Sequence, residues 1–157
     1  MTESFRTEEL FFMMKKIGLD WTVQLKTRLH CENITGVQIY FLVYLLRHHP
    51  EGTYISELCR ETGMAKSTLS ELVKKLKNKG YLKFEKNQDD VRKKKVVPTE
   101  RLQEEKYRIL RAADQTETEI VSVLNPREQF QMWQLEQKLL AQLARMEDSE
   151  KKEVSLP

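Results

Sequence analysis

The strongest constraint on the fold is a set of apolar residues that recur at steps of three and four along most of the chain. Between positions 10 and 29 the members are Leu10, Met14, Ile17, Trp21, Leu25 and Leu29. This spacing places apolar side chains on one face of an α-helix, so a long amphipathic helix is expected over about residues 6–30. Similar spacing predicts helices over 99–124 and from Pro126 onward. With 5 Gly and 4 Pro in 157 residues, turn residues are too few for a sandwich or barrel of many short strands.

Capping signals mark where two of these helices begin. Thr35 is followed three residues later by Gln38, which is a capping-box pattern and predicts a helix from Thr35 to about His48. Asn125, Pro126 and Glu128 have the cap, first-position and third-position residue types that start the last helix. The polar segment from residue 147 to 157 is expected to fray, and we assign 149–157 as a tail.

Shorter elements fill the middle of the chain. A helix opened by Thr53 is expected to run to Thr62, Gly63 supplies a turn, and a second helix covers about 66–79 before Gly80. Residues 81–86 and 95–97 then flank the polar turn 87–90, which predicts a two-stranded hairpin within about 81–98. Because Pro98 donates no ladder hydrogen bond, the second strand is expected to stop early.

Positive charge is concentrated in the same part of the chain. The net charge is only +3, yet residues 63–101 carry twelve basic and five acidic side chains, so the rest of the chain is net negative. Such a concentration is typical of a surface that binds a polyanion, although a solvated lysine-rich surface is the alternative. Two short helices joined by a glycine turn and followed by a basic hairpin form a winged helix-turn-helix, in which the second helix enters the DNA major groove.

Several function classes lack their required residues. The chain has no glycine-rich phosphate loop, no His-Glu-x-x-His element and no nucleophile elbow, so we expect no enzyme and no cofactor. Two cysteines are too few for a disulfide scaffold or a four-thiolate metal site. Neither an apolar span nor a signal sequence is evident, and we therefore expect a cytoplasmic protein without membrane contact.

The hairpin carries an Asp-any-Arg element at Asp90 and Arg92, followed by Val96 and Thr99, and it comes directly after the helix-turn-helix over 55–82. Together these features resemble the MarR family of transcriptional regulators, which implies a bacterial or archaeal protein. The resemblance implies a mainly α winged helix-turn-helix flanked by long dimerisation helices. It places Arg92 at the wing tip against the minor groove or its phosphates, with Asp90 orienting the guanidinium.

We expect the DNA contacts to come from the second helix and the wing. Short hydroxyl and basic side chains at the start of that helix suit phosphate and groove contacts, and Lys74, Lys75, Lys77 and Lys79 continue the positive charge. Glu71 departs from the family pattern, since it is repelled by phosphate but can accept from cytosine N4. The full predicted set is Lys66, Ser67, Thr68, Ser70, Glu71, Lys74, Lys75, Asp90, Arg92, Lys93, Lys94 and Lys95.

The flanking helices are expected to form a homodimer on a palindromic operator. They carry more large apolar residues than one winged domain can cover, which is typical of an interface, although packing within one chain is the alternative. The expected organisation is a dimerisation helix over 1–34, a DNA-binding domain over 35–98 and further dimerisation helices over 99–148.

The resemblance also implies a site that senses a small molecule. Family members bind small aromatic ligands between the dimer helices and the winged domain, so a pocket would be lined by Trp21, Tyr40, Phe41, Tyr44 and Arg47. Ordinary core packing is the favoured alternative for these aromatic residues. Cys31 beside His30 is the candidate redox sensor, and no histidine pair has metal-binding helical spacing.

The sequence therefore predicts a homodimeric regulator that binds double-stranded DNA, most simply as a repressor. A winged-helix protein-interaction module and a redox regulator that uses Cys31 are the alternatives, because a fold does not fix a function.

Overall fold

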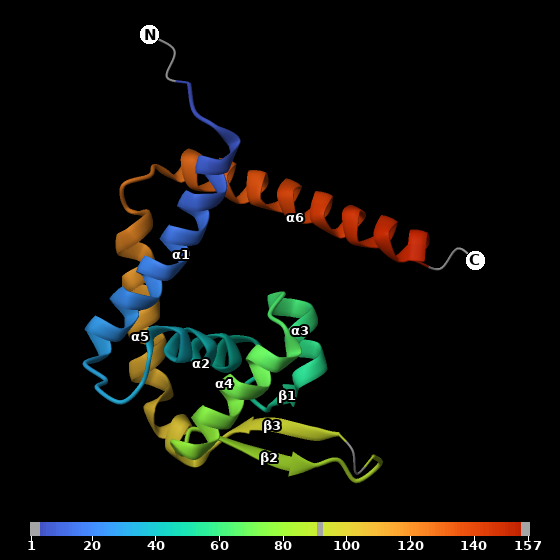
Figure 1. The fold of residues 1–157 in the computed structure, drawn as a ribbon. Helices are drawn as coiled ribbons and strands as arrows, with labels where there is room; N and C mark the ends of the chain where they lie inside the picture. Colours follow the sequence, from blue (N-terminus) through green and yellow to red (C-terminus); the bar gives the residue numbers. More distant parts are fainter. Residues whose placement is uncertain (1–3, 91–92, 155–157) are drawn as a thin grey trace. The chain divides into compact units, whose positions relative to one another are not determined.

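The computed structural model describes residues 4–90 and 93–154, and Figure 1 shows the order of its elements. Within these residues lie six helices and three strands: α1 Thr7–Leu29, α2 Gly36–His48, β1 Thr53–Tyr54, α3 Ile55–Thr62, α4 Lys66–Asn78, β2 Leu82–Lys86, β3 Lys94–Pro98, α5 Glu100–Val121 and α6 Pro126–Val154. The mainly α fold with a small β wing is confirmed. The chain divides into two compact units, residues 1–117 and 118–157.

The core of the first unit is built from the winged helix-turn-helix together with parts of both flanking helices. Phe41, Leu45, Leu58, Leu69 and Leu76 are almost completely buried at its centre. Leu25 and Leu29 of α1 and Leu102, Ile109 and Ala113 of α5 join the same cluster. The segments assigned to dimerisation therefore also complete the core of the winged domain.

Helix α2 begins at the predicted capping box. The Thr35 hydroxyl accepts from the backbone N–H of Gln38 at 3.1 Å, and the Gln38 side chain accepts from the Thr35 N–H at 3.0 Å. Gly36 follows, where an added Cβ would lie 2.4 Å from the carbonyl oxygen of Thr22 on α1. This glycine allows α1 and α2 to pack with their backbones in close approach.

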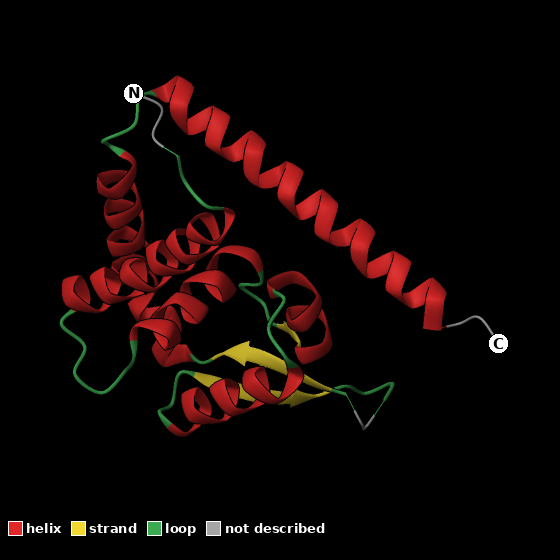
Figure 2. Cartoon of the chain, turned by 45° about the horizontal axis from the view of Figure 1, so that its top comes forward, coloured by secondary structure: helices red, strands yellow, loops and turns green. Residues whose placement is uncertain are grey.

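The wing is a three-stranded antiparallel sheet in the order β1-β3-β2, rather than the predicted two-stranded hairpin (Figure 2). Thr53 and Tyr54 pair with Val96 and Lys95, so the prediction that Thr53 opens a helix is wrong, and α3 begins at Ile55. The Thr53 hydroxyl still donates to Glu57 on the first turn of α3, at 2.6 Å.

Pro98 ends β3 but does not shorten it, so the prediction of an early stop is also wrong. Pro98 lies opposite Leu82, while the neighbouring Thr99 N–H donates to the carbonyl of Tyr81 at 3.1 Å. Ladder hydrogen bonds in an antiparallel pair fall on alternate residues, and Pro98 occupies a position that needs no donor. On its other side, β1 ends before it reaches Pro98.

The second unit contains the end of α5 and the whole of α6. At the predicted start of this helix, Asn125 and Glu128 form a capping box, with hydrogen bonds of 2.9 and 3.0 Å between side chains and backbone N–H groups. The helix continues to Val154, so residues 147–154, which are expected to fray, have helical backbone. Lysine and glutamate favour helix, and the Glu147–Lys151 ion pair at 3.3 Å has the stabilising i, i+4 spacing.

Candidate nucleic-acid interface

Helix α4 has one buried and one exposed face. Leu69, Leu72, Val73 and Leu76 form the buried face. Six of the predicted contact residues of this helix are exposed, namely Lys66, Ser67, Thr68, Glu71, Lys74 and Lys75. Ser70 is half-buried. The helix-turn-helix connection contains Gly63 at φ 75°, a left-handed conformation that favours glycine.

The first turn of α4 presents backbone donors. Its N-cap is Ala65, so no side chain caps the helix there. The first N–H groups of a helix have no intrahelical acceptor, and together with the helix dipole they attract anions. Lys66, Ser67 and Thr68 surround this helix end with further donors, which is the chemistry that a phosphate contact requires.

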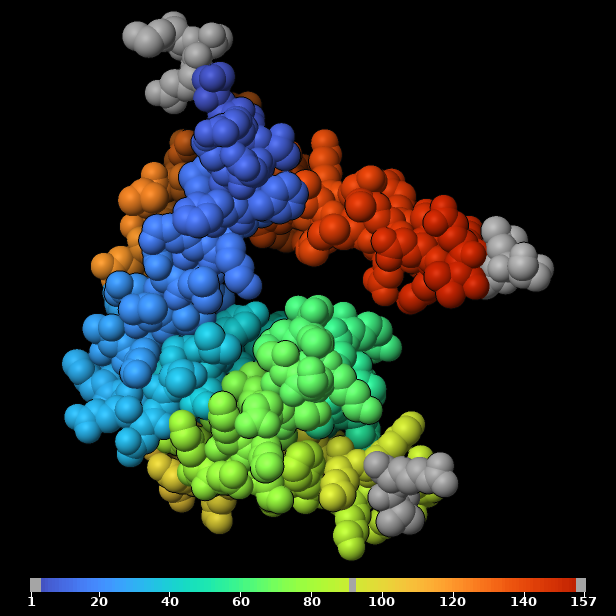
Figure 3. All heavy atoms as spheres, viewed as in Figure 1, coloured from blue at the N-terminus to red at the C-terminus, as the bar shows by residue number. Residues whose placement is uncertain are grey.

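Phe84 joins α4 to the wing. The Nζ of Lys77 on α4 lies 5.3 Å from the centre of the Phe84 ring, and the Nζ of Lys94 on β3 lies 5.9 Å from it. Both distances are within the range of a cation–π interaction. The ring therefore holds a cation from each element beside the other, on the surface where α4 and the hairpin lie side by side (Figure 3).

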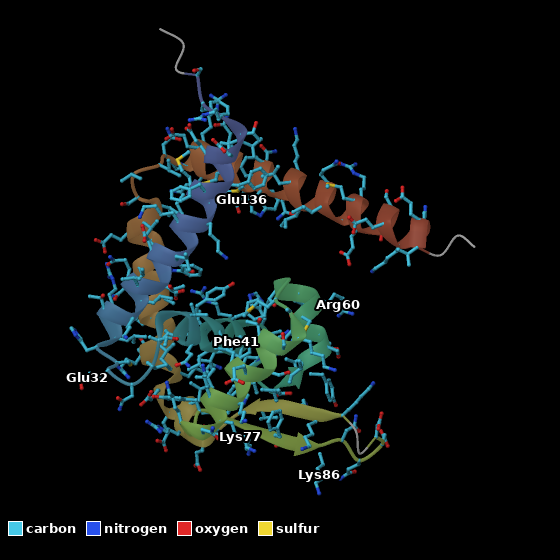
Figure 4. All side chains as sticks on the ribbon, in the orientation of Figure 1. Glu32, Phe41, Arg60, Lys77, Lys86 and Glu136 are labelled. Carbon is cyan, nitrogen blue, oxygen red and sulfur yellow. The ribbon has the colours of Figure 1, made fainter. Side chains whose placement is uncertain are left out.

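The strand register separates the predicted wing lysines. Lys94 lies on the same side of the sheet as Phe84 and the buried Val96. Its partner in the neighbouring strand is Lys86, which lies on that side too. Lys95 lies on the other side, opposite Glu85 and beside Tyr54 of β1. The structure thus brings Lys94, but not Lys95, onto the side of α4. Figure 4 labels Lys77 on α4 and Lys86 near the wing tip.

The tip of the wing is described only in part. Asp90 is half-buried, and Lys93 is exposed with its N–H donating to the Asp90 carbonyl at 3.1 Å. Asn87 donates from its side chain to the Tyr54 hydroxyl at 3.2 Å, which braces the base of the turn on β1. Arg92, placed at the tip by the family resemblance, lies outside the described residues.

Lys79 does not continue the positive surface, contrary to the sequence interpretation. Its Nζ donates to the side-chain oxygen of Gln38 at 2.9 Å, the same oxygen that caps α2. Arg101 of α5 is also structural, since it donates to the Lys79 carbonyl at 2.7 Å and its guanidinium lies 4.6 Å from the centre of the Tyr81 ring. These contacts fix the end of α4 against α2 and α5.

The DNA contacts predicted from the sequence omit two lysines, Lys77 and Lys86, that lie on the basic surface formed by α4 and the wing. The sequence shows Lys77 only as one of several lysines in a row. Its place beside Lys94 over the Phe84 ring depends on contacts between residues that are distant in the chain. Lys86 follows from the hairpin register, because it is the residue opposite Lys94. A turn length read from residues 87–93 could have revealed this pairing.

The predicted pocket residues do not form a single site. Phe41 is buried in the core, and Arg47 makes ion pairs with Asp114 and Glu117 of α5, both at 2.6 Å. The hydrogen bond to Glu117 is the main cause that raises the pKa of Arg47. Trp21 and Tyr40 do meet, edge to face, with ring centres 5.1 Å apart.

Tyr44 contacts a different partner. Its hydroxyl donates to Glu61 of α3 at 2.7 Å, and the Nε2 of His49 lies 2.7 Å from the same carboxylate oxygen. Burial, followed by the Glu61 contact, raises the pKa of Tyr44 to about 12. The Tyr44 hydrogen bond, followed by that of His49, lowers the pKa of Glu61.

The remaining predicted groups have ordinary surroundings. Cys31 is half-buried, and its thiol lies 3.5 Å from the Leu29 carbonyl oxygen. No group of three or more metal-ligating residues is found within residues 4–90 and 93–154. Over the same residues, no helix combines the length and apolar character needed to cross a membrane.

Comparison with known proteins identifies similarities in both sequence and fold. The family model described as MarR family matches residues 32–93. The structure is similar to the MepR–DNA complex of S. aureus, with a TM-score of 0.75, 24% identity, and coverage of 89% of this chain and 99% of that one. A SlyA-like transcription regulator from Listeria monocytogenes gives a TM-score of 0.74 at 17% identity, covering 96% of both chains.

A MarR transcriptional regulator from Methanosarcina mazei Go1 also gives a TM-score of 0.74, at 16% identity, covering 90% of this chain and 94% of that one. At these identities the structural likeness establishes the fold. No curated protein sequence matches the chain.

Proposed function

Since the chain belongs to the MarR family through its winged helix-turn-helix segment, residues 32–93, we propose that it is a sequence-specific regulator that binds double-stranded DNA. The observation that supports this most directly is the basic surface formed by α4 and the wing, in which Lys77 and Lys94 share the Phe84 ring. At the other end of the same helix, the uncapped start of α4 beside Lys66 supplies backbone donors for phosphate. Family members are transcriptional regulators rather than enzymes.

We further propose that the protein acts as a homodimer. Large apolar side chains of α6 recur at steps of three and four and are 41–59% exposed, with Met132, Leu135, Leu139, Leu143 and Met146 forming one stripe. The N-terminal part of α1 exposes Phe11, Phe12 and Ile17 in the same way. Apolar stripes of this length are typical of helix–helix interfaces, and a second copy of the chain would cover them.

The DNA-binding proposal is tested by fluorescence anisotropy with the full-length protein. The probes are a duplex from upstream of its own gene and a scrambled duplex of equal composition, each measured at two salt concentrations. Tight binding to the native duplex that survives the higher salt better than the scrambled control is the expected result. Absence of binding at low salt would favour a protein-interaction module instead.

A matched pair of lysine variants locates the interface. Lys94→Ala removes one cation from each wing of a dimer, so the slope of log K against log salt should flatten by about 2. Lys26→Ala removes an equally exposed cation from α1 and should leave the slope unchanged. Equal effects of the two variants would contradict the assignment of the wing to the interface.

A repressor function with release by a small aromatic effector is the simplest regulatory scheme. The indole N–H of Trp21 supports it, because it is buried and has no hydrogen-bond partner among the described residues. A buried donor without an acceptor is costly, and a carboxylate or hydroxyl of a ligand would satisfy it. We expect aromatic carboxylates to release the protein from DNA, and Trp21→Phe to weaken their effect without weakening DNA binding.

A further inference from the structure

Glu71 is the acidic side chain on the exposed side of α4, a helix that otherwise carries four lysines. Successive helical residues are rotated by about 100°, which places Glu71 opposite the buried face of Leu69, Leu72 and Val73. Its side chain is 62% exposed. If α4 enters the major groove, Glu71 lies at the centre of the surface that meets the bases.

The contacts within the protein do not explain a carboxylate at this position. Its ion pair is with Lys75, at 4.0 Å, and both side chains are more than half exposed. Such i, i+4 pairs contribute little to stability in water. Near DNA the same carboxylate is repelled by phosphate, so it weakens non-specific binding to any sequence.

The chemistry of base edges limits what Glu71 can accept from. In the major groove only the amino groups of cytosine and adenine donate hydrogen bonds. Adenine places the acceptor N7 beside its amino group, where a carboxylate would be repelled, whereas the cytosine edge offers its N4 donor alone. A carboxylate at this point therefore selects a G·C pair with cytosine on the contacted strand.

We propose that Glu71 is a specificity-determining residue that reads a cytosine N4 amino group in each half of the operator. This inference depends on the proposed DNA-binding function and extends it to the base sequence. The lysines around Glu71 supply affinity for phosphate that does not discriminate between sequences. Glu71 opposes binding to DNA in general, and this cost is offset where a cytosine N4 amino group donates to it.

The test is a selection of binding sites from a pool of random duplexes by the full-length protein, followed by sequencing. The wild-type protein should enrich sites with a fixed cytosine in each half-site. Glu71→Gln should lose that preference and shift it toward adenine, because glutamine both donates to N7 and accepts from the amino group. Glu104→Gln on α5 is the control for charge, since Glu104 is also exposed and should leave the enriched sites unchanged.

Binding to individual duplexes then measures the effect. Replacing the fixed cytosine by thymine should weaken wild-type binding roughly tenfold, and should have little effect on binding by Glu71→Gln. Identical enriched sites for the wild-type protein and Glu71→Gln would overturn the inference while leaving sequence-specific binding intact. Binding without any enriched sequence would overturn it as well, and a failure to bind DNA at all would overturn the proposed function with it.

Discussion

Gly36 offers a sharp test of how α1 and α2 pack. A Cβ at this position would lie 2.4 Å from the Thr22 carbonyl oxygen and 2.7 Å from its carbon. Both are backbone atoms of a helix and cannot rotate away, so the two helices would have to separate by nearly 1 Å. Overpacking of this kind costs about 3 kcal/mol, and we expect Gly36→Ala to destabilise the protein by that amount.

Gly18→Ala is the matched control, because it makes the same chemical change within α1. Among the described residues, a Cβ built at Gly18 meets no atom within 4 Å outside the local backbone of its own helix. Replacing a glycine inside a helix by alanine stabilises it by roughly 0.5–1 kcal/mol. The two variants should therefore change stability in opposite directions.

Thermal unfolding followed by circular dichroism measures both effects at equal protein concentration. For a chain of this size a loss of about 3 kcal/mol lowers Tm by roughly 6–12 °C, and the gain at Gly18 raises it by a few degrees. A Gly36→Ala protein that melts with or above the wild type would refute the close approach of α1 and α2.

Three further predictions concern the wing, α3 and α6. Phe84→Leu keeps most of the apolar volume but removes the ring shared by two cations. The free energy of DNA binding, from anisotropy titrations, should therefore fall by more than the free energy of unfolding. Because hydrogen bonding lowers the folded-state pKa of Glu61, its stabilisation is complete above the ordinary glutamate pKa and is lost as the pH falls toward the lowered value. Tyr44→Phe should therefore make the acid-side fall in the urea midpoint shallower, and an unchanged pH profile would contradict this. Asn125→Ala removes the cap of α6 and should cost about 1 kcal/mol in urea unfolding, whereas Asn125→Ser should cost little.

Features set by neighbouring residues could be predicted from the sequence. The capping box at Thr35 and the helix start at Asn125 need only residues three positions apart, and both formed as predicted. The limits of α4 followed from its apolar spacing and from the glycines around it. Local chemistry determines these elements, so tertiary contacts did not have to be known.

Features that depend on distant pairing could not be predicted in this way. The strand at Thr53 is only two residues long and exists because β3 lies beside it, so its sequence carries no strand periodicity. Lys79 resembled its neighbouring lysines in sequence, yet its partner Gln38 is 41 residues away. Lys94 and Lys95 are adjacent and chemically identical, and only the strand register decides which of them lies on the side of the sheet that faces α4.

Helix α1 contributes to the core with one end and exposes apolar side chains at the other, and it thereby connects the proposed dimer contact to the basic surface of α4 and the wing. Its C-terminal part is buried through Thr22, Leu25 and Leu29, whereas the N-terminal part of the same rigid helix exposes its apolar side chains. At Thr22 the helix meets Gly36 with no room for a methyl group, so a shift of α1 must displace the start of α2. The cap of α2 uses Gln38, and Gln38 also accepts from Lys79 at the end of α4. Contacts therefore run without a break from α1 to the helix that we propose enters DNA, and the regulation that we propose would require no change in the proposed base-contacting residues.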